Sequence, residues 1–457
     1  MSQTEPHPAR GFLFDPNRCT GCAACELACS TENALGWGRS WRQVVSVNPE
    51  RRPGIPSFHL SLACNHCDDA PCVRQCPSRA ISRVSATDVV LIDADACIGC
   101  RYCSWVCPYD APRFDEERSV MGKCTACHHR LLEGDSPACV EACPTAALDF
   151  GPLAGGTSLP GFPDTPAAPR IRFAPLRAET HRLESTWTIP ESALRSFAAS
   201  RPPRPAGISL KTEAPLWLFT LGGAGLVAWV LAAALGDVTV EPLRFLAGAL
   251  ATLGVSTLHL GRKLRAWRAV WNLSGSRLSR EVAAYGTFLA TGFAAAWLFP
   301  DSAVAMGAAG GAGLAALFLM DRVYDPVRRT AARPVHSADV VLVGPFLAAV
   351  LLRWPLAFGT LAAVKLVLYL RRKAREGSPR EWPAWALAAG RVLVGLALPA
   401  LLWWMGSDGV WILVFAAVGE AVDRGELYHG LEIPTPRAAA ARVTATGNGS
   451  PTGGGWS

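Results

Sequence analysis

Residues 97–108 read Cys97-Ile-Gly-Cys100-Arg-Tyr-Cys103-Ser-Trp-Val-Cys107-Pro108. Three cysteines separated by two residues each, then a fourth after three more and a proline, is the spacing that binds [4Fe–4S] clusters in pairs. Three closely spaced thiolates hold three corners of one cluster, while the fourth reaches a neighbouring cluster. The segment therefore predicts an α+β ferredoxin-like fold built around iron–sulfur clusters.

The rest of the cysteines repeat this pattern. All sixteen lie between Cys19 and Cys143, in four groups of four. The other groups are Cys19-x2-Cys22-x2-Cys25-x3-Cys29, Cys64-x2-Cys67-x4-Cys72-x3-Cys76 and Cys124-x2-Cys127-x11-Cys139-x3-Cys143. Sixteen thiolates suffice for four [4Fe–4S] clusters, and no expected ligand position holds another residue, so a three-iron cluster is not predicted.

Two other uses of cysteine fit this pattern less well. Four thiolates could hold structural zinc, but zinc sites usually pair two Cys-x2-Cys turns across a longer spacer. Disulfides are not favoured, because nothing resembling a cleavable signal peptide precedes Cys19 and the spacing is regular.

The crossover of the fourth cysteine assigns ligands once the groups are paired. The second and third groups are close in sequence, as in a two-cluster ferredoxin, which leaves the first and fourth as the other pair. The predicted sets are Cys64, Cys67, Cys72 and Cys107; Cys97, Cys100, Cys103 and Cys76; Cys19, Cys22, Cys25 and Cys143; and Cys124, Cys127, Cys139 and Cys29.

The composition changes after the cysteines. The whole chain is 50% hydrophobic and 18% charged, with sixteen tryptophans. We expect a four-cluster domain over residues 1–150, a Pro-, Gly- and Arg-rich extended linker over 151–212, an all-α membrane domain over 213–430 and a disordered tail over 431–457. Eight membrane spans are predicted, at Pro215–Leu235, Leu243–Gly261, Val282–Phe299, Ala303–Met320, Ala338–Leu352, Leu356–Leu370, Trp385–Trp404 and Val410–Val422.

The charges between these spans predict the orientation. With an even number of spans, the loops on the side of the cysteines are 262–280, 322–333 and 371–380, each rich in Arg and Lys. The opposite loops are short and acidic. Because positive loops mark the cytoplasmic side, the clusters are predicted on the cytoplasmic face of a bacterial inner membrane. The absence of an export signal before Cys19 favours the same side.

Ionisable residues within spans are costly and so are candidates for function. They are His259, Glu281, Asp339, Lys365, Arg391 and Glu420, all in the half of the membrane nearest the clusters. Together they indicate a pocket for a quinone, whose electrons and protons are exchanged at one place. Snorkelling span ends are the alternative for Lys365 and Asp339. Haem b is not favoured, because the membrane-level histidines, His259, His336 and His429, all lie at span ends.

Several segments resemble one family. The cysteine groups, with Pro137-Ala-Cys-Val-Glu-Ala-Cys-Pro144, resemble the four-cluster electron-transfer subunit of dimethyl sulfoxide reductase-type molybdoenzymes. The membrane half, with Thr257-Leu-His259-Leu-Gly-Arg, Leu278-Ser-Arg-Glu281 and Gly419-Glu420, is similar to the eight-helix quinol-oxidising anchor of that enzyme.

The resemblance implies a fusion of these two subunits. It implies that His259 and Glu281 serve at a menaquinol site, and that electrons pass to a separate subunit holding molybdenum bis-pterin guanine dinucleotide. The best-known relatives place the clusters on the periplasmic side, carried out with a signal-bearing partner, whereas the charge pattern here predicts the cytoplasm.

Three alternatives stay open at this point. Electrons could flow in reverse, from a molybdoenzyme that oxidises formate or a sulfur compound into quinone. The chain could be a scaffold whose clusters only hold the fold. It could also translocate ions, although few ionisable residues occupy the far half of the membrane.

Overall fold

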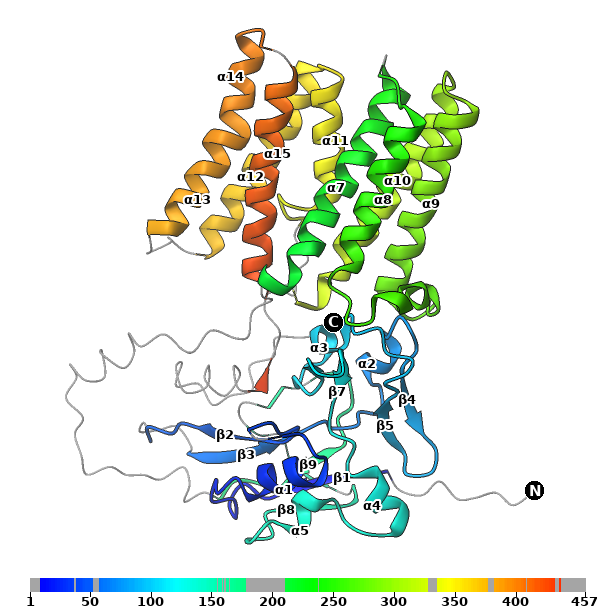
Figure 1. The fold of residues 1–457 in the computed structure, drawn as a ribbon. Helices are drawn as coiled ribbons and strands as arrows, with labels where there is room; N and C mark the ends of the chain where they lie inside the picture. The colour runs from blue at the N-terminus through cyan, green and yellow to red at the C-terminus, as the bar shows by residue number, and fades with distance from the viewer. Residues whose placement is uncertain are drawn as a thin grey trace, which may run out of the picture. The chain divides into compact units, whose positions relative to one another are not determined.

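The computed structural model describes residues 9–177, 210–327, 335–376, 382–431 and 435–436, except residues 37, 52–56, 154, 158, 160–161, 164, 237 and 408. The chain divides into two compact units, Met1–Gly207 with Glu432–Ser457, and Ile208–Leu431 (Figure 1). The first unit contains every cysteine, and the second is helical throughout its described part.

A three-stranded sheet joins the two ends of the first unit. Strand β1 (Arg10–Phe14) lies between β8 (Leu148–Pro152), which is antiparallel to it, and β9 (Ile171–Phe173), which is parallel. Phe12 and Phe14 of β1 are buried, as expected for a strand with one face on a core, and Gly11 between the strands is buried as well. Gly11 permits a close approach, because a Cβ there would overlap the carbonyl oxygen of Arg170. The sheet thus extends past residue 150, into the stretch predicted as a linker; residues 178–209 of that linker and most of the predicted tail lie outside the described residues.

Three hairpins and five short helices complete the described part of the first unit. The hairpins are β2 (Gln43–Val47) with β3 (Phe58–Leu62), β4 (Ile81–Val84) with β5 (Val89–Ile92), and β6 (Arg113–Asp115) with β7 (Val120–Gly122). The helices are α1 (Ala24–Glu32), α2 (Pro71–Arg74), α3 (Tyr102–Val106), α4 (His128–Glu133) and α5 (Ala138–Glu141). The prediction of an α+β ferredoxin-like region is confirmed.

Helix packing brings the cysteine groups together in pairs. Helix α1, which carries Cys25 and Cys29, packs against α5, which carries Cys139. Helix α2, which carries Cys72, packs against α3, which carries Cys103. The first group therefore lies with the fourth, and the second with the third.

The second unit is a helical bundle. Its elements are α7 (Leu210–Leu235), α8 (Pro242–Thr257), η2 (Lys263–Val270), α9 (Arg277–Leu298), α10 (Ala303–Val323), η3 (Asp325–Val327), α11 (Val340–Leu351), α12 (Pro355–Glu376), α13 (Trp382–Val392), η4 (Leu393–Ala397), α14 (Leu398–Trp404) and α15 (Gly409–Gly430). Helix α10 packs against α9 and α7, and α11 packs against α7. Glycines allow this: a Cβ on Gly313 would lie 2.8 Å from Val227.

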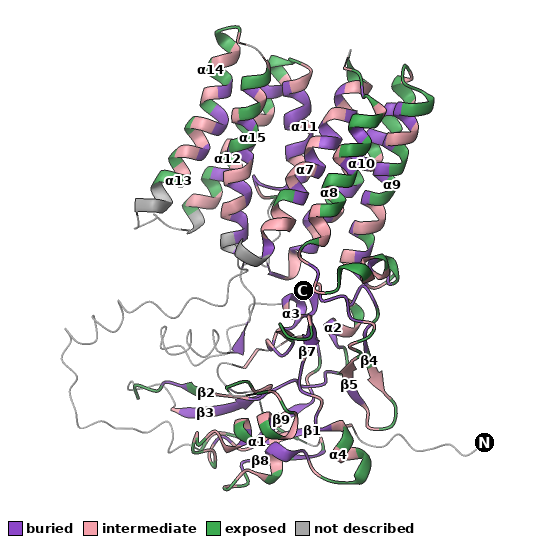
Figure 2. Ribbon diagram, in the orientation of Figure 1, coloured by how far each residue is buried: buried purple, intermediate pink, exposed green. Residues whose placement is uncertain are grey.

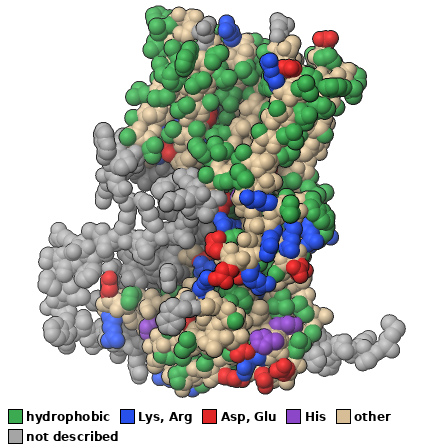
Figure 3. Space-filling view, viewed as in Figure 1, with side chains coloured by type: hydrophobic (Ala, Val, Ile, Leu, Met, Phe, Trp, Pro, Cys, Tyr) green, Lys and Arg blue, Asp and Glu red, His purple; other side chains and the backbone are tan. Residues whose placement is uncertain are grey.

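The surface of this unit is apolar. Large hydrophobic side chains such as Leu243, Val304 and Leu356 are exposed, and hydrophobic atoms cover much of its visible face, with the buried positions turned inward (Figures 2 and 3). Three described helical segments are long and apolar enough to cross a membrane: Glu213–Leu235, Ala303–Val327 and Ala386–Trp404. Val340–Leu351 is apolar but shorter. The unit is a membrane domain, and the count of eight spans stays a prediction.

Candidate functional site

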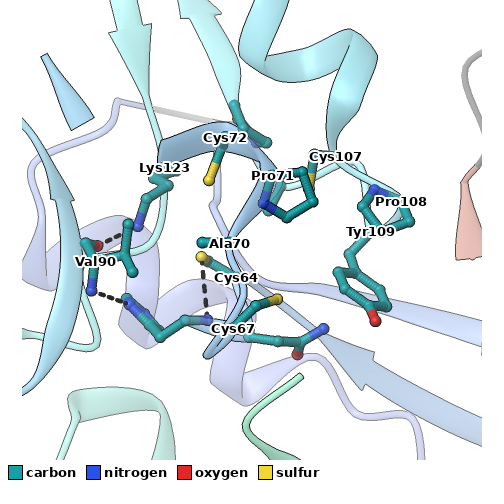
Figure 4. Close-up of a pocket in the computed structure, with 14 residues that line it drawn as sticks. Cys64, Cys67, Ala70, Pro71, Cys72, Val90, Cys107, Pro108, Tyr109 and Lys123 are labelled. Carbon is teal, nitrogen blue, oxygen red and sulfur yellow. Dashed lines mark hydrogen bonds between the residues drawn. The ribbon is translucent and has the colours of Figure 1, made fainter. Parts of the chain in front are cut away.

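Four thiols of the second and third groups surround one cavity. Cys64 and Cys67 come from the loop after β3, Cys72 from α2 and Cys107 from the end of α3, and all four are buried. Figure 4 shows their sulfur atoms facing a common space, with the Lys123 side chain at its edge. We call this group site C.

Four thiols of the first and fourth groups surround a second cavity. They belong to Cys19, Cys22, Cys25 and Cys143. The antiparallel pairing of β1 with β8 explains the meeting of residues so distant in sequence, because Cys19 follows β1 and Cys143 precedes β8. We call this group site A.

The remaining thiols also lie in two groups. Cys76 and Cys97 are close enough to Cys100 and Cys103 to raise the pKa of both thiols, after the larger effect of burial. Likewise Cys139 and Cys29 raise the pKa of Cys127, again after burial. We call Cys97, Cys100, Cys103 and Cys76 site D, and Cys124, Cys127, Cys139 and Cys29 site B.

The backbone at the first cysteine of each group adopts a common conformation. The residue two positions later has a positive φ in all four groups: Gly21 (74°), His66 (44°), Gly99 (70°) and Ala126 (51°). The amide N–H of three of them donates to the sulfur of the first cysteine, at 3.5 Å for His66, 3.4 Å for Gly99 and 3.3 Å for Ala126. Such bonds stabilise a thiolate over a thiol.

These donor sets fit iron–sulfur clusters. Each site offers thiols alone, which are the ligands that [4Fe–4S] clusters take. Burial raises the pKa of Cys72 to about 11 and that of Cys107 to about 12. Iron binding would displace those protons, because only the thiolate is a ligand. Within the described residues, no three His, Cys, Asp or Glu side chains are arranged to hold a single metal ion.

His66 and Lys123 accompany the ligands of site C. The Val90 N–H donates to His66 Nδ1 at 3.0 Å, and burial lowers the pKa of His66 well below its ordinary value. Lys123 Nζ donates to the Val90 and Cys124 carbonyls. The histidine is therefore neutral, whereas the lysine brings a charge into the interior.

The two predicted quinol-site residues have different surroundings. His259 is half-buried just beyond the end of α8, and its Nδ1 contacts the Ser256 carbonyl. Glu281 is buried on α9, within electrostatic range of Arg424 and Asp321.

Three of the other predicted membrane residues meet in one buried ionic cluster. Glu420 of α15 pairs with Lys365 of α12 and with Arg391 of α13, each at 3.0 Å. Asp339 precedes α11, accepts from the His336 N–H at 2.8 Å and lies within electrostatic range of Arg424.

Sequence reasoning missed other buried charges of this unit, among them Asp423, Arg424 and Asp321. Asp423 lies 3.3 Å from Arg391, and Arg424 pairs with Asp321 at 3.1 Å. All three are buried, but each lies at or beyond the end of a predicted span, where a charge is ordinary. Their periodicity offers the only signal: Glu420, Asp423 and Arg424 are spaced to share one face of a helix.

Together, the fold and the site define a membrane-bound iron–sulfur electron-transfer protein. Residues 56–153 match the model of the 4Fe–4S dicluster domain, and residues 240–304 match that of the DMSO reductase anchor subunit (DmsC).

Curated relatives match the cysteine-rich part. The protein is 43% identical over 151 residues to the "Probable anaerobic dimethyl sulfoxide reductase chain YnfG" of Escherichia coli strain K12, and the match covers 31% of this sequence and 73% of that one. It is 42% identical over 151 residues to an anaerobic dimethyl sulfoxide reductase chain of the same strain, with the same coverage. It is 36% identical over 161 residues to a sulfite dehydrogenase subunit of Allochromatium vinosum, and this match covers 31% of this sequence and 67% of that one.

The protein belongs to the family of dimethyl sulfoxide reductase iron–sulfur subunits, here fused to a DmsC-type membrane anchor. The predicted fusion of the two subunits is confirmed. The protein is thus an electron-transfer and membrane-anchoring component of a dimethyl sulfoxide reductase-type complex, which implies a catalytic partner subunit.

Proposed function

We propose that this chain oxidises menaquinol in the membrane and passes the electrons, one at a time, through four [4Fe–4S] clusters to a separate molybdopterin-containing subunit. The observation that carries the proposal is the presence, in one polypeptide, of sixteen cysteines in four groups and a DmsC-type anchor. The clusters would supply one-electron carriers, so a two-electron donor in the lipid can be coupled to a protein partner.

The ligand sets that we propose are sites A to D. Two observations support them: the thiols of sites A and C each line one cavity, and the paired helices join the first group to the fourth and the second to the third.

His259 and Glu281 are proposed to take up the quinol protons. The contact of His259 Nδ1 with the Ser256 carbonyl oxygen requires a proton on Nδ1, so Nε2 is the ring atom that can accept one. Glu281 is a buried carboxyl group, and we propose that it accepts a proton from the quinol in the same pocket. Arg391, Glu420, Lys365 and Asp339 remain candidates for the wall of the quinone pocket, although three of them already bond one another.

The location proposed is the bacterial inner membrane, with the clusters on the cytoplasmic face. The excess of Arg and Lys in the loops on one side supports this orientation. Proteolysis of sealed vesicles of known orientation, followed by detection of the cysteine-rich unit, tests it.

Reduction of the clusters by a menaquinol analogue tests the function. In the purified chain, we expect quinol to bleach the cluster absorbance in the wild type, and Glu281→Gln or His259→Arg to slow this reduction at least about tenfold. Glu241→Gln is the control, because Glu241 lies at the other end of α8, where it pairs with the nearby Arg244. Unchanged reduction in both site variants would favour the scaffold, and a pH gradient beyond scalar proton release would favour ion translocation.

Reverse flow, into quinone, is the second candidate. The similarity to a subunit of a sulfite dehydrogenase favours it, because that name denotes an oxidising enzyme. A redox titration separates the two directions: clusters mostly far below menaquinone in potential would indicate quinone reduction.

A further inference from the structure

Arg42 is a buried cation without a carboxylate partner among the described residues. Its side chain is 1% exposed and lies in the first unit, just before β2. Nη1 donates to the carbonyl and to Oγ of Ser61, both at 3.2 Å, and the guanidinium carbon lies 4.4 Å from the centre of the Phe12 ring. Nε and Nη2 are buried with no hydrogen-bond acceptor in the part of the chain that the structure describes.

Lys123 is the second such cation. It is 2% exposed, and it is the only lysine before Lys211. Its Nζ has two carbonyl acceptors, Val90 and Cys124, and no carboxylate partner among the residues that the structure describes.

A third buried cation of the same unit, Arg170, has the carboxylate partners that Arg42 and Lys123 lack among the described residues. Arg170 is 7% exposed and pairs with Asp68 at 2.6 Å and with Asp88 at 2.5 Å. An isolated charge in a protein interior costs several kcal/mol unless an opposite charge compensates for it. Arg42 and Lys123 therefore need negative charge from another source.

Both cations lie close to the cysteine sites. Arg42 lies within electrostatic range of Cys25 of site A and of Cys29, Cys124 and Cys139 of site B. Ser61 Oγ joins Arg42 to site A directly, since it is also 3.4 Å from Cys25 Sγ. Lys123 lies within range of Cys124 of site B and of Cys64 and Cys72 of site C. No cysteine of site D is among the main electrostatic neighbours of either cation.

We propose that Arg42 and Lys123 are fixed positive charges between the cluster sites that raise reduction potentials in a set pattern. Arg42 acts on sites A and B, Lys123 acts on sites B and C, and we expect neither to act strongly on site D. A cluster held by four thiolates is anionic and becomes more so on reduction, so a nearby cation in a poorly solvated interior favours the reduced state. This inference rests on the proposed ligand sets.

A potentiometric titration of the full chain, followed by low-temperature paramagnetic resonance, tests the pattern. In Arg42→Gln we expect two of the four potentials to fall, and in Lys123→Gln also two, with one potential lowered by both substitutions. The double variant should lower three potentials and leave one unchanged. We expect each fall to be at least about tenfold in the reduction equilibrium constant, which is about 59 mV for a one-electron step.

Two controls separate charge from structure. Arg42→Lys keeps the charge and should restore the wild-type potentials. Arg39→Gln removes an arginine close by in sequence that is exposed and paired with Glu117, and should change none of them. Iron and sulfide content, measured on every variant, shows whether four clusters are present.

The outcomes are distinct. Four clusters with unmoved potentials in both glutamine variants would overturn the inference, and so would an equal fall of all four. Fewer clusters in Arg42→Gln, with unmoved potentials in those that remain, would also overturn it in favour of a structural role. A wild-type chain without four clusters would instead refute the proposed function.

Discussion

Gly395 and Gly419 are in direct backbone contact: a Cβ added to either glycine would overlap the Cα of the other. The contact joins η4 to α15 next to the Arg391–Glu420 ion pair. The π-helical turn η4 widens the helix at this point, and such turns often occur at functional sites.

We therefore expect Gly395→Ala to force η4 and α15 apart. Overpacking of this kind costs about 1–3 kcal/mol, and here it would also stretch the Arg391–Glu420 pair. Thermal unfolding of the detergent-solubilised chain measures the loss. Gly390→Ala is the matched control, because a Cβ at Gly390 meets no atom within 4 Å. Equal stability of the two variants would contradict the close contact.

Glu420 forms ion pairs with two buried cations, Lys365 and Arg391. Lys365 and Arg391 are both 0% exposed, so Glu420→Ala would leave their charges less compensated. Removing one member of a buried ion pair costs about 3–5 kcal/mol. Asp423, 3.3 Å from Arg391, should reduce this loss. Denaturant unfolding, with the exposed Glu241→Ala as control, provides the measurement, and a loss no larger than that of the control would refute the buried network.

The ligand sets predict which cysteine substitutions remove the same cluster. Cys107→Ser and Cys64→Ser should abolish one paramagnetic signal, while Cys76→Ser and Cys97→Ser should abolish a different one. The reason is the crossover of the fourth thiolate, which places Cys107 beside Cys64 in site C although it follows Cys103 of site D in sequence. If Cys107→Ser removed the signal that Cys97→Ser removes, the nesting would be wrong.

The predicted pairing of the cysteine groups stays a prediction, and it could be made from the sequence because the constraint is local. The spacing around Cys107 leaves its thiol unable to join the three cysteines that precede it, so a partner group is required, and the shortest connection selects Cys64. The β1–β8 pairing completes the same arrangement for Cys19 and Cys143.

What the sequence could not predict depends on tertiary contacts. Arg42 and Arg39 lie in similar sequence surroundings, but their exposure differs. Arg42 is buried beside the cysteines, because the β2–β3 hairpin brings Ser61 into contact with it. The Arg39 side chain is 55% exposed. Asp321 and Arg424 lie 103 residues apart and form an ion pair that no local pattern indicates. The β9 strand is missed for a different reason: its three residues carry too little periodicity to be recognised.

Removal of iron should make the stability of the first unit sensitive to alkaline pH. Burial raises the pKa of Cys72 from 9.0 to about 11, so in the iron-free fold its thiol keeps a proton that the unfolded chain has already lost. A group whose pKa is raised by folding contributes stability below its unfolded pKa, and this contribution is lost as the pH rises towards the folded value. Each such thiol then costs about 1.4 kcal/mol of folding free energy per pH unit within that interval.

We expect the urea midpoint of unfolding of the iron-free chain, measured without oxygen, to fall between pH 8 and pH 10. The iron-loaded chain should not show this fall, because the metal has already deprotonated its thiols. The same shift in both forms would show that the buried thiols are not its cause.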